Sequence, residues 1–149
     1  MEKLNFPNFN IRLKNKENKH FIFDIIRKKW FLLTPEEWVR QHCIHYLVYK
    51  KHYLKSFINV EKKILVNGIN KRYDIVVFSK NADVLVLVEC KSPKISINQD
   101  VFDQISKYNL TFKSKYLMVS NGLSHYFCSV NYKTKNYLFL TEIPNYENT

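Results

Sequence analysis

Residues 84–93, VLVLVECKSP, join an uninterrupted apolar run to charged side chains, and this junction constrains the fold more than any other stretch. Five apolar residues open the stretch and predict a β-strand buried on both faces, as in the centre of a sheet. The run continues directly into Glu89, Cys90 and Lys91, where the chain should still be inside the protein. Burying a carboxylate without a partner costs several kcal/mol or shifts its pKa. Another part of the chain must therefore compensate Glu89.

The composition predicts a single globular domain. The chain has 149 residues, of which 46% are hydrophobic, and this is enough to bury a sizeable core. We divide the domain 1–149 into an N-terminal hairpin extension, 1–33, and a core, 34–143. No stretch approaches about 18 consecutive apolar residues, and the first residues contain no apolar signal segment. We therefore expect a cytoplasmic protein with no membrane partner.

The charge balance favours a polyanionic partner. Lysine and arginine together number 24 and the acidic residues 13, so the net charge is 24 − 13 = +11. Such an excess points first to nucleic acid and second to an anionic membrane surface. Solubility alone would also explain a lysine-rich chain, so charge does not decide the function.

Residue periodicity predicts an α+β sandwich. A helix begins at Thr34, because Thr34, Pro35 and Glu37 form a capping box at the start of segment 34–52. A second amphipathic helix is predicted over 98–112. The expected order is helix, three-stranded meander, helix and strand, plus an N-terminal and a C-terminal hairpin, which makes a mixed sheet flanked by helices. The predicted strands are 57–66, 71–79, 83–91, 115–122, 124–132 and 136–143, with a hairpin turn at Asn67-Gly68 and a basic hairpin within 9–33.

Two strands of this meander carry the charged residues. Alternation along the third strand places Glu89 and Lys91 on one face, together with Leu85 and Leu87. Asp74 adjoins an apolar run on the preceding strand in the same way. If the two strands pair as a hairpin, the turn lies midway between Asp74 and Glu89 and the two carboxylates converge.

Two carboxylates and a lysine at one point can serve phosphodiester hydrolysis. Like charges repel unless a cation lies between them, and Mg²⁺ prefers carboxylate oxygens together with water and phosphate. The metal can activate water, and Lys91 could hold that water or stabilise the charge that develops on phosphorus. The same spacing also fits a simple ion pair, Glu89–Lys91 or Asp74–Arg72, at the solvated end of a sheet.

The segments RYDIVVF and LVECK resemble the D-x(n)-(D/E)-x-K signature of the restriction-endonuclease-like nucleases. Gln104 and Tyr108 match the QxxxY motif of a subset that includes RecB-like nucleases and the N-terminal nuclease domain of type I restriction enzyme R subunits. The stretches IFDIIRKKWFLLTPEEWVRQ and YLMVSNG also resemble that R-subunit family, so the resemblance runs from about Phe21 to Ile143. The D-x(n)-ExK pattern alone is common, whereas its placement before a QxxxY helix is more specific.

The resemblance implies a set of metal ligands. Asp74 and Glu89 would bind Mg²⁺, for which Mn²⁺ could substitute, and the backbone carbonyl of Cys90 would be a third ligand. Lys91 would be the catalytic lysine. Tyr73 stands where the broad signature often has a proline, which leaves the expected metal ligands unchanged.

The resemblance also assigns roles on the two helices. Gln104 and Tyr108 would organise the site and contact the DNA backbone, although Tyr108 could equally be a core residue and Gln104 a solvent-facing one. Some members add a glutamate from the first helix, which would be Glu37 or, as a second choice, Glu36. The capping box already explains Glu37 without catalysis.

Two functions are consistent with these residues. The first is a Mg²⁺-dependent DNA endonuclease domain, with possible partners among the helicase or specificity subunits of a restriction system and a possible homodimer for cutting both strands. The alternative is an inactive nuclease-fold module for DNA binding or assembly. The sequence contains no GxxxxGK[ST] phosphate-binding motif, so we expect no ATP-driven translocation from it.

Overall fold

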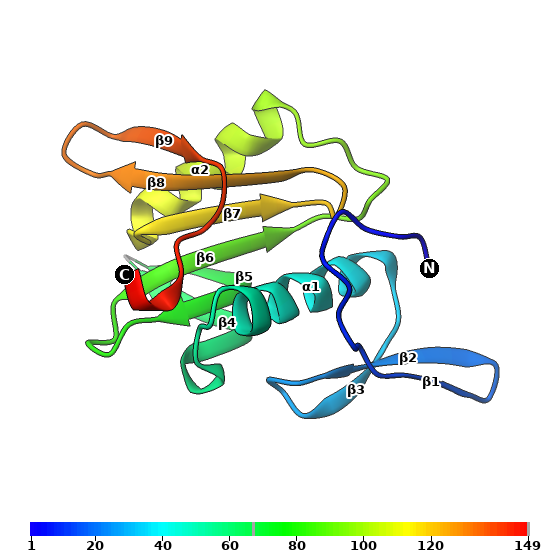
Figure 1. Ribbon diagram of the computed structural model, residues 1–149. Helices are drawn as coiled ribbons and strands as arrows, with labels where there is room; N and C mark the ends of the chain where they lie inside the picture. The colour runs from blue at the N-terminus through cyan, green and yellow to red at the C-terminus, as the bar shows by residue number, and fades with distance from the viewer. Residues whose placement is uncertain (67, 149) are drawn as a thin grey trace.

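A computed structural model describes residues 1–66 and 68–148, and it contains two β-sheets and two main helices (Figure 1). Within the described residues, the larger sheet has six strands in the order β4-β5-β6-β7-β8-β9; the β6–β7 pair is parallel and the other neighbouring pairs are antiparallel. The helix α2 (Gln99–Phe112) connects these two parallel strands. This architecture confirms the predicted α+β fold with a mixed sheet. The strands are β4 (Ile58–Val66), β5 (Ile69–Phe78), β6 (Val84–Cys90), β7 (Tyr116–Ser120), β8 (His125–Asn131) and β9 (Asn136–Leu140).

The predicted three-stranded meander corresponds to β4, β5 and β6, which pair antiparallel in chain order. Pairing between β4 and β5 extends to the last residues before the turn, as the hairpin prediction requires. Asn67 of the predicted Asn67-Gly68 turn lies outside the described residues. Gly68 has a φ of +78°, a conformation that glycine adopts without strain.

The helix α1 (Pro35–His45) begins as the capping box predicts. The hydroxyl of Thr34 accepts a hydrogen bond of 3.0 Å from the Glu37 backbone N–H, and Pro35 occupies the first turn. After α1 the backbone continues through a π-helical turn at Tyr46–Lys50. Lys55–Phe57 and Tyr146–Asn148 form short 3₁₀ turns.

The two helices cover opposite faces of the six-stranded sheet (Figure 1). On one face, Val39, Cys43 and Ile44 of α1 belong to a buried cluster with residues of β5, β6 and β7. On the other face, Phe102 and Ile105 of α2 pack with the alternate residues of the same strands. Every residue of β7 is buried, and β6 is buried except for its half-buried first residue, as expected for central strands covered on both sides.

The side-chain alternation of β6 differs from the prediction. Leu85 lies in the α1-side cluster with Val86, whereas Leu87 lies on the α2 side, so Leu85 and Leu87 do not share a face. The reason is a shift in the pairing with β5: Val77 pairs with Val86, but the next residue, Phe78, pairs with Val84. A bulge that places two residues opposite one reverses the alternation on one side of it.

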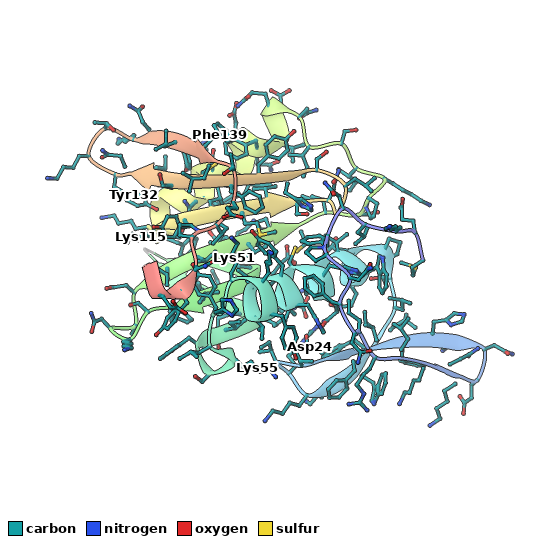
Figure 2. All side chains as sticks on the ribbon, viewed as in Figure 1. Asp24, Lys51, Lys55, Lys115, Tyr132 and Phe139 are labelled. Atoms are coloured by element: carbon teal, nitrogen blue, oxygen red, sulfur yellow. The ribbon has the colours of Figure 1, made fainter. Side chains whose placement is uncertain are left out.

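The N-terminal segment forms a three-stranded sheet rather than the predicted hairpin. The strands β1 (Leu13–Lys16) and β2 (Lys19–Asp24) make that hairpin, and β3 (Lys29–Leu32) adds a third strand along β2. A tight turn after β2 returns the chain, and the Lys28 backbone N–H bonds to the Asp24 carbonyl at 2.8 Å. We call β1–β3 the N-terminal sheet. It projects beside α1, and Figure 2 labels Asp24 where the two meet.

No helix within the described residues is long and apolar enough to span a membrane.

Candidate active site

The β5–β6 pairing brings Asp74 and Glu89 together, and we call these two residues the carboxylate pair. Ile75 pairs with Val88, so Asp74 and Glu89 are the next residues on their strands, and they lie close enough for the charge of Asp74 to raise the pKa of Glu89. The Oδ2 atom of Asp74 accepts a hydrogen bond of 2.7 Å from the Cys90 backbone N–H. The predicted convergence of the two carboxylates is therefore present in the structure.

Glu89 is buried, and one of its two carboxyl oxygens has no hydrogen-bond partner among the described residues. The residue is 8% exposed, and this oxygen is Oε1. Burial and, after it, the nearby charge of Asp74 raise the pKa of Glu89, while Lys71 and Lys91 lower it, and the net result is a pKa of about 8. In the absence of another cation, Glu89 therefore holds a proton at neutral pH.

Lys91 directly follows the last residue of β6 and lies near Glu89 and Glu36. Its backbone N–H donates a 2.8 Å hydrogen bond to the Ser120 carbonyl on β7, which fixes the chain where it leaves the sheet. Its half-buried side chain lowers the pKa of both Glu89 and Glu36. Lys91 is thus positioned within electrostatic reach of the carboxylate pair.

Glu36, rather than Glu37, faces the carboxylate pair. Burial and the charge of Asp74 raise the pKa of Glu36, which Arg40 and Lys91 lower. Both oxygens of Glu37 are already engaged: Oε1 accepts bonds from Arg27 at 3.0 Å and Arg40 at 2.9 Å, and Oε2 accepts one from Gln41 at 3.2 Å. The structure thus places the first-choice helix residue, Glu37, in a structural network.

Arg40 is a component that the sequence-based interpretation missed. Its guanidinium lies 2.8 Å from Asp74 Oδ1 and 3.2 Å from Glu36. A second arginine, Arg27, shares Glu37 and Glu61 with Arg40 and also pairs with Asp24 of the N-terminal sheet. We call the whole set the arginine network; it consists of Arg27 and Arg40 with Asp24, Glu36, Glu37, Gln41, Glu61 and Asp74. One signal was present in the sequence, because Arg40 follows Glu36 and Glu37 by four and three residues, the spacing of one helical turn.

Lys71 is a second missed residue. Its Nζ atom lies 4.2 Å from the ring centroid of Tyr108, and its charge lowers the pKa of Glu89. Lys71 therefore links the carboxylate pair on β5–β6 to the QxxxY helix. The available signal was a cation three residues before Asp74 on the same predicted strand.

The two residues of the QxxxY motif lie on the exposed side of α2. Tyr108 is 38% exposed, and it lies close enough to the buried Tyr73 to raise the pKa of that phenol, after the larger effects of burial and Glu89. Gln104 is exposed, and its side chain makes no hydrogen bond to another described residue. The structure brings Tyr108 toward the site and leaves Gln104 facing solvent.

The donor set of the carboxylate pair fits Mg²⁺ in its chemistry. Glu89 supplies an unpaired buried oxygen, and a cation would remove the repulsion that raises its pKa. No cluster of three His, Cys, Asp or Glu side chains suited to a metal ion occurs within residues 1–66 and 68–148. Such an ion would therefore need further ligands from water or phosphate. The Cys90 thiol turns away from the site and lies 3.8 Å from the Cys43 sulfur.

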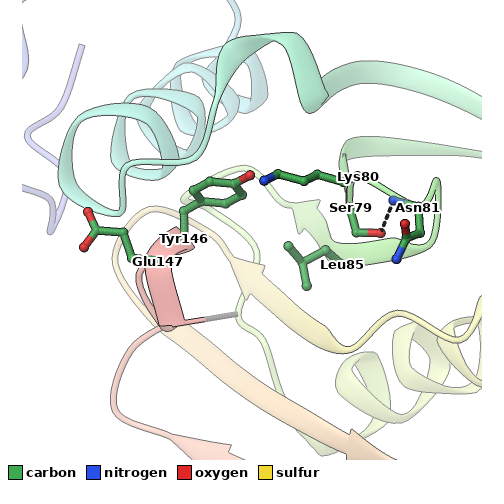
Figure 3. Close-up of a pocket in the computed structure, with 6 residues that line it drawn as sticks. All are labelled: Ser79, Lys80, Asn81, Leu85, Tyr146 and Glu147. Atoms are coloured by element: carbon green, nitrogen blue, oxygen red, sulfur yellow. Dashed lines mark hydrogen bonds between the residues drawn. The ribbon is translucent and has the colours of Figure 1, made fainter.

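A surface hollow of about 410 Å³ lies at the opposite end of the β5–β6 pair. It is lined by the β5–β6 turn and the C-terminal segment, with the Lys80 and Tyr146 side chains pointing toward each other (Figure 3). The carboxylate pair does not line this hollow. Its lining residues are Ser79, Lys80, Asn81, Leu85, Tyr146 and Glu147.

Comparisons with known proteins support the family and the fold. The sequence profile of the type I restriction enzyme R protein N terminus matches residues 35–144. A solved structure from Vibrio vulnificus YJ016, described as a fragment of an HsdR subunit of a type I restriction enzyme, superposes with a TM-score of 0.52 at 17% identity. That match covers 76% of this chain and 24% of the other, so the chain spans about a quarter of that structure's length. A search of curated protein sequences gave no match.

Proposed function

Because the chain belongs to the type I restriction enzyme R protein N-terminal family, we propose that it is a Mg²⁺-dependent endonuclease domain that hydrolyses DNA phosphodiester bonds. The observation that carries the proposal is the carboxylate pair, in which Asp74 is half-buried and the buried Glu89 has an oxygen with no partner among the described residues, near Lys91. A purely structural glutamate at this depth would be expected to have its hydrogen bonds satisfied.

In this proposal, four residues have separate roles in phosphodiester hydrolysis. Asp74 and Glu89 would hold the metal, with Mn²⁺ as a substitute. Bound Mg²⁺ would supply an activated water and neutralise negative charge on the phosphate. Lys91 would orient that water or donate to the phosphoryl oxygen as charge develops. Glu36 would accept a proton or add an oxygen ligand; the influence of Asp74 and Lys91 on its pKa supports this role.

Tyr108 and Lys71 would position the DNA. The Lys71 ammonium lies over the Tyr108 ring near the carboxylate pair, where a cation can meet a phosphate oxygen. Gln104, one turn earlier on the same exposed side of α2, would contact the backbone farther along. The wider family implies DNA and the other subunits of a restriction system as partners, and a homodimer would allow both strands to be cut.

Plasmid nicking tests the proposal directly. Purified wild-type protein with Mg²⁺ or Mn²⁺ is expected to convert supercoiled plasmid to nicked or linear forms, and Lys91→Ala is expected to abolish this conversion. Lys94→Ala is the matched control, since Lys94 is an exposed lysine three residues away. Equal rates for wild type and Lys91→Ala would show that any nuclease activity arises elsewhere.

One observation favours the alternative of an inactive DNA-binding or assembly module. Arg40 already supplies a positive charge to Asp74 at 2.8 Å, so Asp74 has less need of a metal. Titration calorimetry separates the two functions. DNA binding without detectable Mg²⁺ binding, in a protein that also fails to nick plasmid, would support the inactive module.

A further inference from the structure

The N-terminal sheet has two faces of opposite character. The inward face contains Ile22 and Asp24, both fully buried against the rest of the protein. Strand alternation and the cross-strand pairs place a different set of residues on the other side. We call this second set the outward face; it consists of Arg12, Lys14, Lys16, Lys19, Phe21, Phe23, Trp30 and Leu32.

The inward face holds the sheet in a fixed position beside the candidate active site. Asp24 accepts hydrogen bonds from the Arg27 side chain at 2.7 Å and from Gln41 of α1 at 2.9 Å. Burial alone would raise the pKa of Asp24, but the hydrogen bonds from Arg27 and Gln41 bring it below the ordinary value. Arg27 also bridges to Glu37 and Glu61, so the arginine network joins the N-terminal sheet to the carboxylate pair.

The outward face holds cations on aromatic rings. The Arg12 guanidinium lies 4.4 Å from the Phe23 ring centroid, and the Lys14 ammonium lies 4.4 Å from that of Trp30. Contacts of this kind orient a charged group and reduce its conformational freedom before any partner arrives. Because the cations lie over these half-buried rings, the face presents ordered positive charge rather than open stacking platforms.

The tip of the outward face brings two lysines together on either side of the Glu17-Asn18 turn. Lys16 and Lys19 are direct cross-strand partners, a pairing of like charges that destabilises a hairpin. In the part of the chain that the structure describes, none of the four cations Arg12, Lys14, Lys16 and Lys19 forms an ion pair. A bound polyanion would relieve this repulsion.

We infer that the outward face binds the phosphate backbone of double-stranded DNA and thereby presents the duplex to the carboxylate pair. Charge complementarity argues for a polyanion, and covered rings argue for backbone contact rather than base stacking. The choice of DNA among polyanions rests on the proposed function. The surface lies outside residues 35–144, which match the family profile, so it is a feature of this chain's N-terminal extension.

Salt-dependent DNA binding in EDTA tests this inference without any requirement for cleavage. The outward-face variant Arg12→Gln/Lys14→Gln/Lys16→Gln/Lys19→Gln is compared with a control that removes four exposed lysines at the other end of the molecule: Lys113→Gln/Lys115→Gln/Lys133→Gln/Lys135→Gln. Fluorescence anisotropy with a labelled duplex gives the dissociation constant at several salt concentrations. Both variants carry the same net charge, so general electrostatics affects them equally.

We expect the outward-face variant to bind at least about tenfold more weakly than the control at about 0.1 M salt. Loss of four phosphate contacts should reduce the slope of log K against log salt by about 3 to 4. Its melting temperature should stay close to that of wild type, because relief of the Lys16–Lys19 repulsion offsets the lost ring contacts of Arg12 and Lys14. Trp30→Leu, which keeps every charge but removes a ring, should weaken binding by a smaller factor.

Three outcomes would overturn the inference: equal losses in the two variants, tighter binding to duplex RNA than to DNA, or tighter binding to phosphatidylserine vesicles. The metal-free assay keeps these outcomes separate from the nuclease proposal. A wild type that never nicks plasmid, yet loses DNA binding through the outward-face substitutions, would contradict the nuclease and support the DNA surface. If the wild type nicks plasmid but the outward-face variant binds DNA as well as the control variant does, the nuclease proposal is supported and the DNA-binding surface is contradicted.

Discussion

Two glutamates of this protein are buried to nearly the same extent and have opposite surroundings. Glu37, 6% exposed, lies in the arginine network with both oxygens hydrogen-bonded. Glu89, 8% exposed, lies in the carboxylate pair with one oxygen unpaired and a pKa of about 8. The difference teaches that burial alone does not identify a functional acid. In the folded protein the Glu37 carboxylate already has its hydrogen-bond and ion-pair partners. The unpaired oxygen of Glu89 would gain a partner only from a cation that binds after folding.

Glu89→Gln gives the largest expected effect and tests the functional side of this comparison. The substitution keeps the shape of the side chain but removes the negative charge that would hold Mg²⁺. We expect plasmid nicking to fall by about a thousandfold or more, equivalent to roughly 4 kcal/mol of activation free energy. The melting temperature without metal should not fall, because a neutral amide replaces a carboxyl whose charged form is unfavourable here.

The control for this substitution is Asp83→Asn, which removes an exposed acid from the β5–β6 turn. It should leave nicking unchanged. If the Glu89→Gln protein nicks plasmid at the wild-type rate, Glu89 has no role in cleavage, and the contrast between a structural Glu37 and a functional Glu89 is wrong.

Glu37→Gln tests the structural side. Arg27 and Arg40 would each lose the negative charge of the carboxylate that they share, and both would remain largely buried. Breaking one partner of a buried ion pair costs about 3 kcal/mol, which chemical denaturation can measure. The neighbouring Glu36→Gln is the control, since Glu36 is exposed and should change stability by less than about 1 kcal/mol. Equal stability of these two variants would contradict the structural role of Glu37.

The elements and the carboxylate pair were predictable because their signals are local. A capping box defines the start of α1, and an apolar run that ends in Glu89 defines the central strand. The turn at residues 79–83 lies midway between Asp74 and Glu89, so the two residues could be placed near each other from the chain alone, even though a bulge shifts the exact register by one residue.

The arginine network was not predictable in the same way, because it joins residues far apart in the sequence. Arg27 contacts Glu61, 34 residues later, and that contact exists only because the N-terminal sheet packs beside α1. The choice between Glu36 and Glu37 depends on the same packing. The shift at Val77/Phe78 had no local signal that the alternation rule could use, so Leu85 was placed on the wrong face.

The unusual ionisation of Glu89 gives a pH-dependent stability. Between the ordinary glutamate pKa of 4.5 and its value of about 8 in the folded protein, the folded state holds a proton that the unfolded chain has released. The contribution of this group to stability is therefore complete below the lower value and is lost as the pH rises through the upper one. We expect metal-free wild type to lose about 2 kcal/mol more than Glu89→Gln between about pH 5 and pH 9.

Magnesium should reverse this loss, because a bound cation favours the charged form of Glu89. The rise in melting temperature on adding Mg²⁺ should be larger near pH 8 than near pH 6, where protons compete for the same oxygen. A Mg²⁺ effect that is the same at both pH values would argue that the ion binds away from the carboxylate pair.

Lys71→Gln gives the smallest expected effect. It tests whether Lys71, which contacts Tyr108 of α2, influences both the pKa of Glu89 and DNA cleavage. Lys71 lowers the pKa of Glu89 and contacts the Tyr108 ring, so its loss should both raise that pKa and weaken phosphate binding. We expect nicking to fall about tenfold, and the pH dependence of stability to move to higher pH. Lys80→Gln, at the other end of β5–β6, should change neither quantity. If nicking falls while the pH dependence of stability is unchanged, Lys71 acts on the DNA alone. The charges that shift the pKa of Glu89 are then those of Asp74 and Lys91.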